Sequence, residues 1–387
     1  MYSFPVACLM LYDVLRYEDS TPYEVADVMG LSTKNKFFAI TLPYLRKPII
    51  SVVFVTFTMI ITDYGVPLMV GGKYMTLPVM MYQDVIGMLD FGKGSVIGML
   101  LLVPALFACI LDMMNRDKGN TAFIGKPHVI KDSVVKERVA KCICLLVVLC
   151  VFLPIGSFAV LGFVNKYPID MSVSFKNINQ AIRMGSIKYL RNSIIIALVV
   201  SILGTALALL NAYMTARNKT KVSYVLHLMS IISLAIPGFV LGLSYVMFFK
   251  STPIYGTFAI LFLVNSMHFF SSPYLMAYNT FGKINENLEG VGLTMGISKW
   301  KVIKDVLLPQ ATGTIIEMMS YFFVNCMMTI SAVSFLSNVN NKPIALMITQ
   351  FEGQMQLECA AFVSLIILVV NIAMKYIVFV AKKKIAR

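Results

Sequence analysis

The chain has 387 residues, of which 58% are hydrophobic and only 13% are charged, and its formal net charge is +14. A soluble domain carries about 25% charged residues, so this composition excludes an ordinary water-soluble protein and favours one embedded in a bilayer. The positive charge lies in short segments between apolar stretches and forms no single stripe, which argues against nucleic acid as a partner.

The apolar stretches, taken in chain order, predict membrane helices. Residues 2–15 are apolar but too short to cross a bilayer, which takes about 17–25 helical residues. Backbone groups in lipid must be hydrogen-bonded within their own segment, so the longer stretches are expected to be helical. The sequence therefore predicts an all-α polytopic membrane protein with about eight complete transmembrane helices plus a partial one. The complete spans are predicted near 49–69, 94–111, 142–164, 193–216, 222–249, 254–281, 311–336 and 357–380.

The positions of Lys and Arg predict the orientation of these spans. Most of the 33 basic residues fall in alternate connections, and this set includes the C-terminal run Lys382-Lys383-Lys384. By the positive-inside rule these connections face the cytoplasm. We therefore expect a multi-pass membrane protein, in contact with lipid, with a cytoplasmic C-terminus. The connections in question are 16–48, 112–141, 217–221, 282–310 and 382–387.

Two of the predicted cytoplasmic loops repeat each other. Residues 23–32 read Tyr-Glu-Val-Ala-Asp-Val-Met-Gly-Leu-Ser, and residues 289–298 read Glu-Gly-Val-Gly-Leu-Thr-Met-Gly-Ile-Ser. An offset of 266 places Gly30 on Gly296 and Pro43 on Pro309. Each loop is followed by a span, a connection and a second span, so the repeat extends beyond the loops themselves.

The residues of each loop predict a helix, a break and a second helix. Gly30 suits the left-handed position that ends a helix. Ser32 and Ser298 follow the break, where a short polar side chain caps the next helix. Pro43 and Pro309 are expected near the start of the following membrane helix, where a missing N–H costs little.

These loops resemble the EAA motif of binding-protein-dependent ABC permeases, which reads E-A-A, three residues, Gly, about nine residues and I-x-L-P. In the second copy Gly290 stands where the motif has Glu, and Glu289 lies one place earlier. The resemblance implies that each loop couples the membrane helices to an ATPase subunit. The matching residues are Glu24, Ala26, Gly30, Leu42 and Pro43 in the first copy, and Glu289, Gly292, Gly296, Leu308 and Pro309 in the second.

The resemblance also implies a division of the chain into two permease halves. Residues 142–387 match a complete second half with six spans, and residues 112–141 match a cytoplasmic linker. Residues 1–111 match the C-terminal part of a first half, since only residues 2–15 precede its loop where the second half has four spans. We therefore expect the physiological protein to be longer, or a neighbouring gene to supply the rest.

The chain itself carries no recognisable catalytic chemistry. No segment reads G-x-x-x-x-G-K-[ST], and neither G-x-S-x-G nor H-E-x-x-H occurs. The seven cysteines lack metal-ligand spacing. We predict no catalytic residue, no metal site and no cofactor bound by this chain. ATP is expected on two copies of a P-loop ATPase subunit, and an extracytoplasmic solute-binding protein is the other expected partner.

Polar residues inside predicted spans are candidates for the translocation path, because ionisable and polar groups are costly in a bilayer. They are Asp63 in the span after the first loop, and Asn325, Thr329, Ser331 and Ser334 in the matching region of the second half. The stretch 314–336 resembles permeases of ferric-iron and 2-aminoethylphosphonate importers, most closely those of the phosphonate type. The resemblance implies one of these solutes and a location in the bacterial inner membrane.

Two other interpretations remain open. An ion-gradient-driven secondary transporter would also show repeats and broken helices near mid-membrane, although it has no use for EAA-like loops. An inactive truncated permease fragment would explain the absent spans, although such a relic should have lost its repeat and gained charges in its spans.

Overall fold

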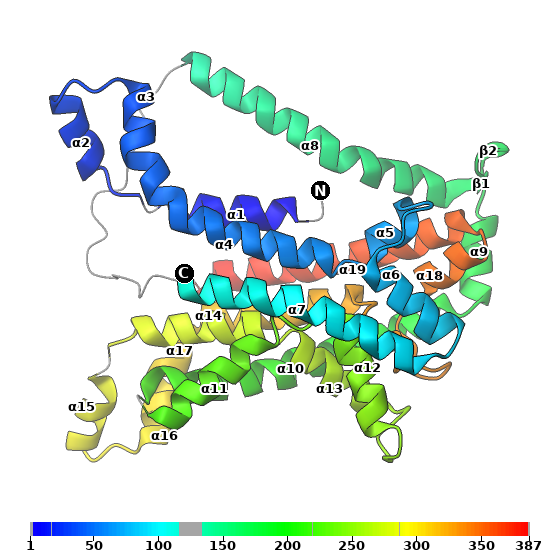
Figure 1. The fold of residues 1–387 in the computed structure, drawn as a ribbon. Coiled ribbons are helices and arrows are strands. Elements are labelled where there is room, and N and C mark those ends of the chain that lie inside the picture. Colours follow the sequence, from blue (N-terminus) through cyan, green and yellow to red (C-terminus); the bar gives the residue numbers. More distant parts are fainter. Residues whose placement is uncertain (1–2, 17, 116–133, 219, 286, 386–387) are drawn as a thin grey trace. The chain divides into compact units, whose positions relative to one another are not determined.

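The computed structural model describes residues 3–16, 18–115, 134–218, 220–285 and 287–385 (Figure 1). The described chain is almost entirely helical, as predicted, with one short antiparallel pairing of β1 (Val164–Lys166) and β2 (Asp170–Val173). Residues 116–133 of the predicted linker 112–141 lie outside the described residues. The chain divides into two compact units, one of residues 1–83 and 96–155, the other of residues 84–95 and 156–387.

The first unit is built around one long helical segment. Its N-terminal helix packs against α4, where the Tyr44 hydroxyl donates to the Val14 carbonyl at 3.2 Å. Buried Leu45, Val52, Met81 and Leu101 supply its core. In chain order the elements are α1 (Phe4–Arg16), α2 (Thr21–Val28), α3 (Thr33–Lys36), the π-helical turn η1 (Phe37–Thr41), α4 (Leu42–Ile61), α5 (Gly65–Val70) and α6 (Leu77–Tyr82). Three further elements are shared with the second unit: η2 (Gln83–Gly87), α7 (Phe91–Asn115) and α8 (Val134–Phe163).

In the second unit several helices pack against the long helix α10 (Ser186–Arg217), and α18 and α19 pack against each other. After the two strands come α9 (Lys176–Arg183), α10 (Ser186–Arg217), α11 (Lys221–Ile232), α12 (Gly238–Phe249), α13 (Phe258–His268), α14 (Ser271–Lys283), α15 (Leu288–Thr294), α16 (Lys299–Val302), η3 (Ile303–Leu307), α17 (Leu308–Met328), α18 (Ala345–Gly353) and α19 (Leu357–Ile385).

Small residues let neighbouring helices approach α10 closely. Ala197, Ser201, Gly204, Ala208 and Ala212 recur three or four positions apart on its buried face. A Cβ on Gly204 would lie 2.9 Å from the ring of Phe322 on α17. Membrane helices have no hydrophobic drive to associate with one another in lipid, so such close van der Waals packing is what holds them together.

Four helical segments of the described chain are long and apolar enough to cross a membrane, judged by length and composition: 33–61, 134–163, 186–217 and 357–384. The predicted span 254–281 is bent by 53° between α13 and α14, and counting this pair as one gives up to five. Our prediction of one helix over 222–249 was wrong, because α11 and α12 are separated at residues 233–237. Pro237, which has no N–H to donate, stands at the N-cap of α12.

The residues between the predicted spans 311–336 and 357–380 are not a simple loop. They include α18, whose residues Ala345, Leu346, Met347 and Phe351 are buried in the core of the second unit. The helix observed over the predicted span 311–336 is α17. It begins earlier than predicted, at Leu308, and also ends earlier, at Met328. Hydropathy alone cannot separate an apolar segment that crosses a bilayer from one that folds back into a protein core.

Candidate functional site: the two repeated loops

The two loops have the same backbone plan, which supports the repeat predicted from the sequence. We call residues 21–43 the first loop and residues 287–309 the second loop. The second helix of each loop starts at Thr33 or Lys299, the π-helical turn starts at Phe37 or Ile303, and the long helix starts at Leu42 or Leu308. Every one of these boundaries is repeated at an offset of 266 residues.

Each first helix ends in the same glycine turn. Gly30 and Gly296 have φ values of +68° and +69°, as expected for a residue that ends a helix in the left-handed region. The Leu31 amide donates to Ala26 O at 3.0 Å, and the Ile297 amide donates to Gly292 O at 2.8 Å. These two hydrogen bonds, together with those that the glycine N–H groups donate, form a Schellman motif in both loops. The prediction of a break at Gly30 is confirmed.

The serine after each break caps the next helix. Ser32 Oγ accepts from the Asn35 amide and Ser298 Oγ accepts from the Lys301 amide, both at 3.4 Å. Both serines have the extended backbone of an N-cap residue. The caps predicted from the sequence are therefore confirmed.

Pro43 and Pro309 are the second residues of α4 and α17, as predicted, but neither helix begins from a loop. Helical structure is continuous from Thr33 to Ile61 and from Lys299 to Met328, and a π-helical turn precedes each proline. The amides of Leu42 and Leu308 bond five residues back, to Phe37 O and Ile303 O. A proline inside an α-helix clashes with the carbonyl four residues earlier, and the wider turn accommodates it.

The first loop is held to its own long helix by hydroxyl hydrogen bonds. The buried Tyr23 donates to Glu18 Oε1 at 2.6 Å, and its hydroxyl lies 2.5 Å from Thr41 Oγ1. Burial, reinforced by the hydrogen bond to Glu18, raises the pKa of Tyr23 to about 12. The neighbouring Glu24 is exposed and accepts from Ser20 Oγ at 3.0 Å.

The second loop is held by an ion pair at the same position of the repeat. Glu289 corresponds to Tyr23, and its carboxylate accepts from Arg217 Nε at 2.7 Å and Nη2 at 2.5 Å. Burial alone would raise the pKa of Glu289, but the hydrogen bond and charge of Arg217 outweigh it, so the pKa is lowered. Glu289 thus pairs within its own unit, although it lies one place away from the motif's glutamate.

A small buried residue follows three positions later in both loops. Ala26 and Gly292 occupy the same repeat position and are both buried. A Cβ on Gly292 would lie 2.6 Å from Val302 Cγ2. The first loop has Lys36 in place of Val302, and Lys36 pairs with Asp27. The small residue therefore lets the first helix of each loop lie against the second.

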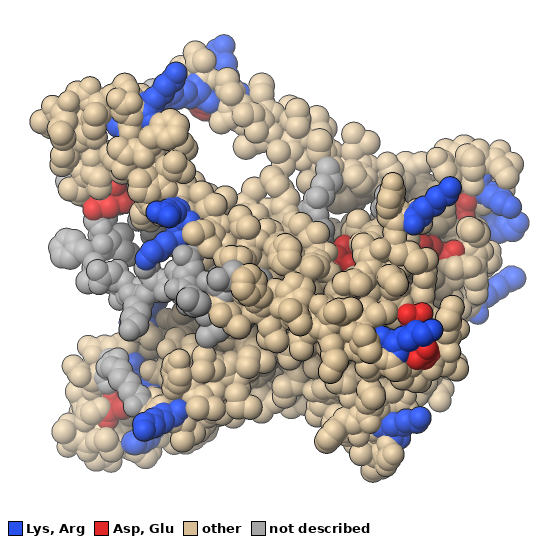
Figure 2. Space-filling view, viewed as in Figure 1, with Lys and Arg blue, Asp and Glu red and all other residues tan. Residues whose placement is uncertain are grey.

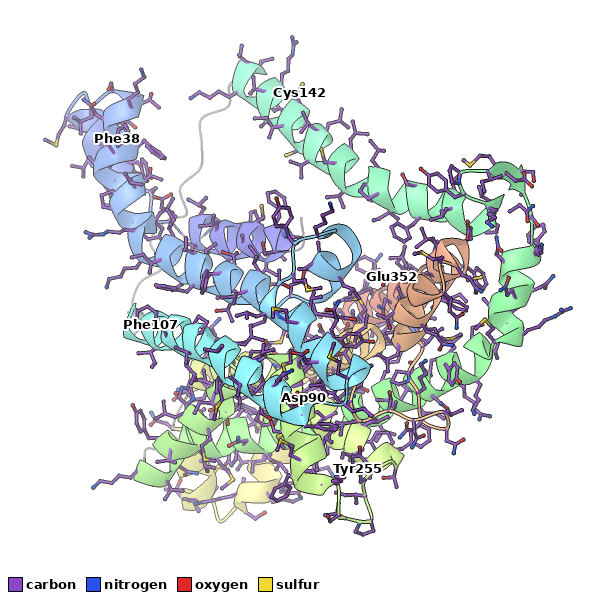
Figure 3. All side chains as sticks on the ribbon, turned by 45° about the vertical axis from the view of Figure 1, so that its right-hand side comes forward. Phe38, Asp90, Phe107, Cys142, Tyr255 and Glu352 are labelled. Carbon is purple, nitrogen blue, oxygen red and sulfur yellow. The ribbon has the colours of Figure 1, made fainter. Side chains whose placement is uncertain are left out.

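Both loops expose apolar side chains at the same positions. Val25 and Val291 are 54% and 52% exposed, and Met29 and Met295 are 71% and 69% exposed. Trp300 in the second loop and Phe38 in the first, which is labelled in Figure 3, are also largely exposed. Exposed apolar groups outside membrane helices point to a surface that another protein covers.

The residues predicted for the translocation path are divided between the two units. Asp63 belongs to the first unit, where its carboxylate accepts from the Gly65 amide at 3.2 Å. The other four belong to the second unit. Asn325 and Ser334 bond to carbonyls one turn back in their own segment, and Thr329 is buried where α17 ends. A Cβ on Gly238 would lie 2.2 Å from Ser331 Oγ, so Ser331 packs closely against the start of α12.

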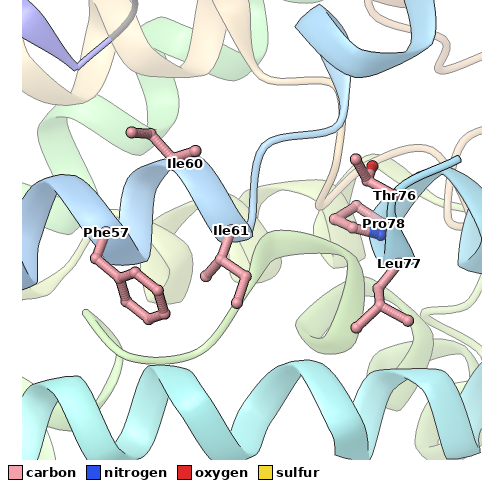
Figure 4. Close-up of a pocket in the computed structure, with 6 residues that line it drawn as sticks. All are labelled: Phe57, Ile60, Ile61, Thr76, Leu77 and Pro78. Atoms are coloured by element: carbon pink, nitrogen blue, oxygen red, sulfur yellow. The ribbon is translucent and has the colours of Figure 1, made fainter. Parts of the chain in front are cut away.

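A cavity of about 340 Å³ lies in the first unit between α4 and the start of α6 (Figure 4). Its lining is almost wholly apolar, and none of the predicted path residues contributes to it. The lining residues are Phe57, Ile60, Ile61, Thr76, Leu77 and Pro78.

Among the residues that the structure describes, no three His, Cys, Asp or Glu side chains are grouped to hold a metal ion. The surface in Figure 2 is largely uncharged, as the composition leads one to expect.

Sequence reasoning missed the anchors of the two loops. Glu18 and Thr41 lie outside the motif, and Arg217 is separated from Glu289 by 72 residues. The available signals were weak: an Arg ends the apolar run of α10, and Tyr23 and Glu289 share one repeat position.

Comparisons with known proteins cover most of the chain. A family profile described as "Binding-protein-dependent transport system inner membrane component" matches residues 1–115 and 209–387. The ferric transport system permease protein FbpB of Actinobacillus pleuropneumoniae is 23% identical over 351 residues, which is 87% of this chain and 51% of that protein. The chain spans about half the length of the curated relatives that it matches over most of its own length.

Two further similarities cover less of the chain. The molybdate/tungstate transport system permease protein WtpB of Methanocaldococcus jannaschii is 33% identical over 96 residues, which is 24% of this chain and 38% of that protein. A crystal structure of a bacterial ABC transporter involved in the import of the acidic polysaccharide alginate has a chain that aligns with a TM-score of 0.53 at 12% identity. The alignment covers 64% of this chain and 96% of that one. At this identity the likeness concerns the fold alone.

Proposed function

Because the chain belongs to the family of binding-protein-dependent transport system inner membrane components, we propose that it is a permease subunit of an ATP-driven importer. Its helices line the route of the solute, and ATP is hydrolysed on a separate subunit. The observation that carries this proposal is the pair of loops. Two segments 266 residues apart share one backbone plan, and both expose apolar side chains at matching positions.

We propose that each loop docks one copy of a P-loop ATPase subunit. A helix that exposes apolar side chains fits a hydrophobic groove on a partner. Val25 and Met29 would enter that groove from the first loop, and Val291 and Met295 from the second. The glycine turn then fixes the angle between the docked helix and the helix that continues into the membrane.

The packing of α19 supports a cytoplasmic C-terminus. Lys382, near the end of α19, pairs with Glu317 on α17. Since α17 follows the second loop directly, the C-terminal end of the second unit lies on the same side as that loop. The ATPase and the basic C-terminus therefore share one face of the membrane.

For the solute we propose ferric iron, delivered by an extracytoplasmic binding protein. The support is the similarity over 87% of the chain to ferric transport permeases. A phosphonate such as 2-aminoethylphosphonate is the alternative suggested by the stretch 314–336. In cells that lack the gene, loss of radiolabelled ferric uptake with unchanged 2-aminoethylphosphonate uptake would support iron, and the reverse would support the phosphonate.

The permease role is tested by purifying the chain with a C-terminal tag from its native membrane in mild detergent and identifying its partners by mass spectrometry. We expect a P-loop ATPase to copurify with the unsubstituted chain. The double variant Met29→Glu and Met295→Glu should lose it, because a charge cannot enter an apolar groove. A matched control, Val135→Glu at an exposed position of the predicted cytoplasmic connection 112–141, tests whether any added carboxylate has the same effect. An unsubstituted chain that is pure and active in uptake without an ATPase would favour a secondary transporter instead.

A further inference from the structure

Arg217 makes more hydrogen bonds than an ion pair requires. Besides its two bonds to Glu289, its Nη1 donates to Phe281 O at 3.3 Å and Ile284 O at 2.8 Å, and its Nη2 donates to Asn285 O at 2.8 Å. These carbonyls belong to the last turn of α14 and the residues just after it, where a helix leaves its carbonyls without partners. The side chain is only 5% exposed.

One guanidinium therefore joins three elements of the second unit. Arg217 itself is the last residue of α10, the carbonyls end α14, and Glu289 lies in the first turn of α15. Arg is suited to this because its planar group presents five donors in fixed directions. We call the contacts of Arg217 with Glu289, Phe281, Ile284 and Asn285 the Arg217 clamp.

The two membrane helices in the clamp are also joined further along. Thr215 Oγ1 lies 2.8 Å from the Tyr274 hydroxyl, which connects α10 with α14 in the buried interior. Asn211 Nδ2 donates to Ser230 Oγ at 2.6 Å, which connects α10 with α11. A displacement that reaches the end of α10 is thus passed to α11 and α14 as well.

The first loop is anchored by different chemistry at the same repeat position. Its anchor at the same repeat position, Tyr23, bonds to Glu18 and to Thr41, which lies on the helix that the loop itself continues into. The anchors of the two loops therefore bond to different elements. The first loop is tied to its own following helix, and the second is tied to helices that precede it.

We propose that Arg217 is a positioning residue that carries movement of the second loop to α10 and α14. This inference rests on the proposed function, in which an ATPase moves the loops. It acts by fixing Glu289 and the end of α14 to the end of α10.

The test is hydrogen–deuterium exchange of the copurified transporter, with and without ATP and orthovanadate as the probe. In the unsubstituted protein we expect the nucleotide to change exchange in the second loop and in residues 205–217 and 271–284. In Arg217→Lys, which keeps a charge but has no fork, the second loop should still respond and the response of 205–217 and 271–284 should be lost. Glu289→Gln, which keeps an acceptor for Arg217, should weaken that response less.

Two matched variants separate transmission from general damage. Tyr23→Phe in the first loop should leave the response of 205–217 unchanged. Lys141→Gln removes an exposed charge that pairs with Glu137 on α8, and it should change neither response. A response of 205–217 that survives in Arg217→Lys overturns the inference. So does loss of the response in the second loop itself, because Arg217 would then merely hold the docking surface.

The two possible failures are distinguishable. If no ATPase copurifies with the unsubstituted chain, the proposed function fails, and the inference that rests on it fails with it. If the ATPase is present and α10 responds equally in all variants, the inference alone fails.

Discussion

The two loops have the same backbone conformation, but different side-chain contacts hold them in place. At an offset of 266 residues their glycine turns, serine caps and π-helical turns coincide, and the φ values of the two glycines differ by only one degree. Yet the residue at one shared position is Tyr23 in the first loop and Glu289 in the second, with different partners.

This difference teaches which features the repeat requires. The features that coincide depend on backbone chemistry: a residue that tolerates positive φ, a hydroxyl that caps a helix, and a residue without an N–H. Anchoring a loop requires only that one buried side chain forms a hydrogen bond or an ion pair, and several residue types can do this. We therefore expect substitutions at backbone positions to act alike in both loops and substitutions at anchors to act in one.

The largest effect is expected at the glycine turns. Gly30→Pro and Gly296→Pro each demand φ near −65° where the chain has about +68° or +69°, and each removes an amide that bonds to Asp27 O or Leu293 O. The local cost should be about 3 kcal/mol or more. We expect solute-stimulated ATP hydrolysis to be lost in both, while membrane insertion, measured by carbonate extraction, stays normal. An effect confined to one loop would contradict the equivalence of the backbones.

A smaller effect, and one in the second loop only, is expected at the buried small residue. Gly292→Ala gains helix propensity worth about 1 kcal/mol. It also forces a Cβ to within 2.6 Å of Val302 Cγ2, and overpacking of this kind costs about 1–3 kcal/mol. We expect a net loss of stability in the loop, measured by hydrogen exchange of residues 288–294.

The control for this prediction uses the same pair of positions. Adding Val302→Ala to Gly292→Ala removes the atom that clashes, so the double variant should recover exchange protection relative to Gly292→Ala alone. In the first loop Ala26→Gly should cost only about 1 kcal/mol through propensity. Simple additivity of the two second-loop substitutions would show that the clash is not what limits residue 292.

The fold class and the plan of the loops were predictable from sequence, because they depend on local signals. Hydropathy predicts the long helices, and Gly30 and Ser32 predict a break and a cap from their own backbone preferences. The π-helical turns before Pro43 and Pro309 were not predicted, since a proline in a helical pattern is compatible with a start, a kink or a widened turn.

What escaped prediction depends on contacts between distant residues. The Arg217 clamp joins residues that are far apart in sequence, and no local pattern marks such a pair. The burial of α18 likewise depends on the helices around it, since its apolar residues would equally suit a membrane span or a core. The predicted path residues remain a prediction, because Asp63 and the other four belong to different units.

An effect on the second loop alone is expected on acidification. The folded pKa of Glu289 is lowered below 4.5, its ordinary value, so its stabilising contribution is present above that pH and is lost as pH falls through the folded pKa. Trp300, the single tryptophan of the chain, lies in the second loop and reports on it by fluorescence. We expect acrylamide quenching of Trp300 to rise below pH 4.5.

Glu289→Gln is the matched variant for this titration. It lacks the carboxylate, so its Trp300 quenching should change little over the same pH range. A transition of equal size in both proteins would assign the acid sensitivity to another group and remove the basis for an electrostatic anchor in the second loop.

The smallest effect is expected at the serine caps, and it should be the same in both loops. Ser32→Ala and Ser298→Ala each remove one acceptor for an amide, at a distance of 3.4 Å that is long for such a bond. Cap removal costs about 0.5–2 kcal/mol, and the long distance places both near the lower limit. Exchange of the Asn35 and Lys301 amides should quicken about equally, while Ser→Asp at either position should retain protection because a carboxylate also caps. A clearly larger loss in one loop would mean that the anchors, and not the shared backbone, set the stability of the second helices.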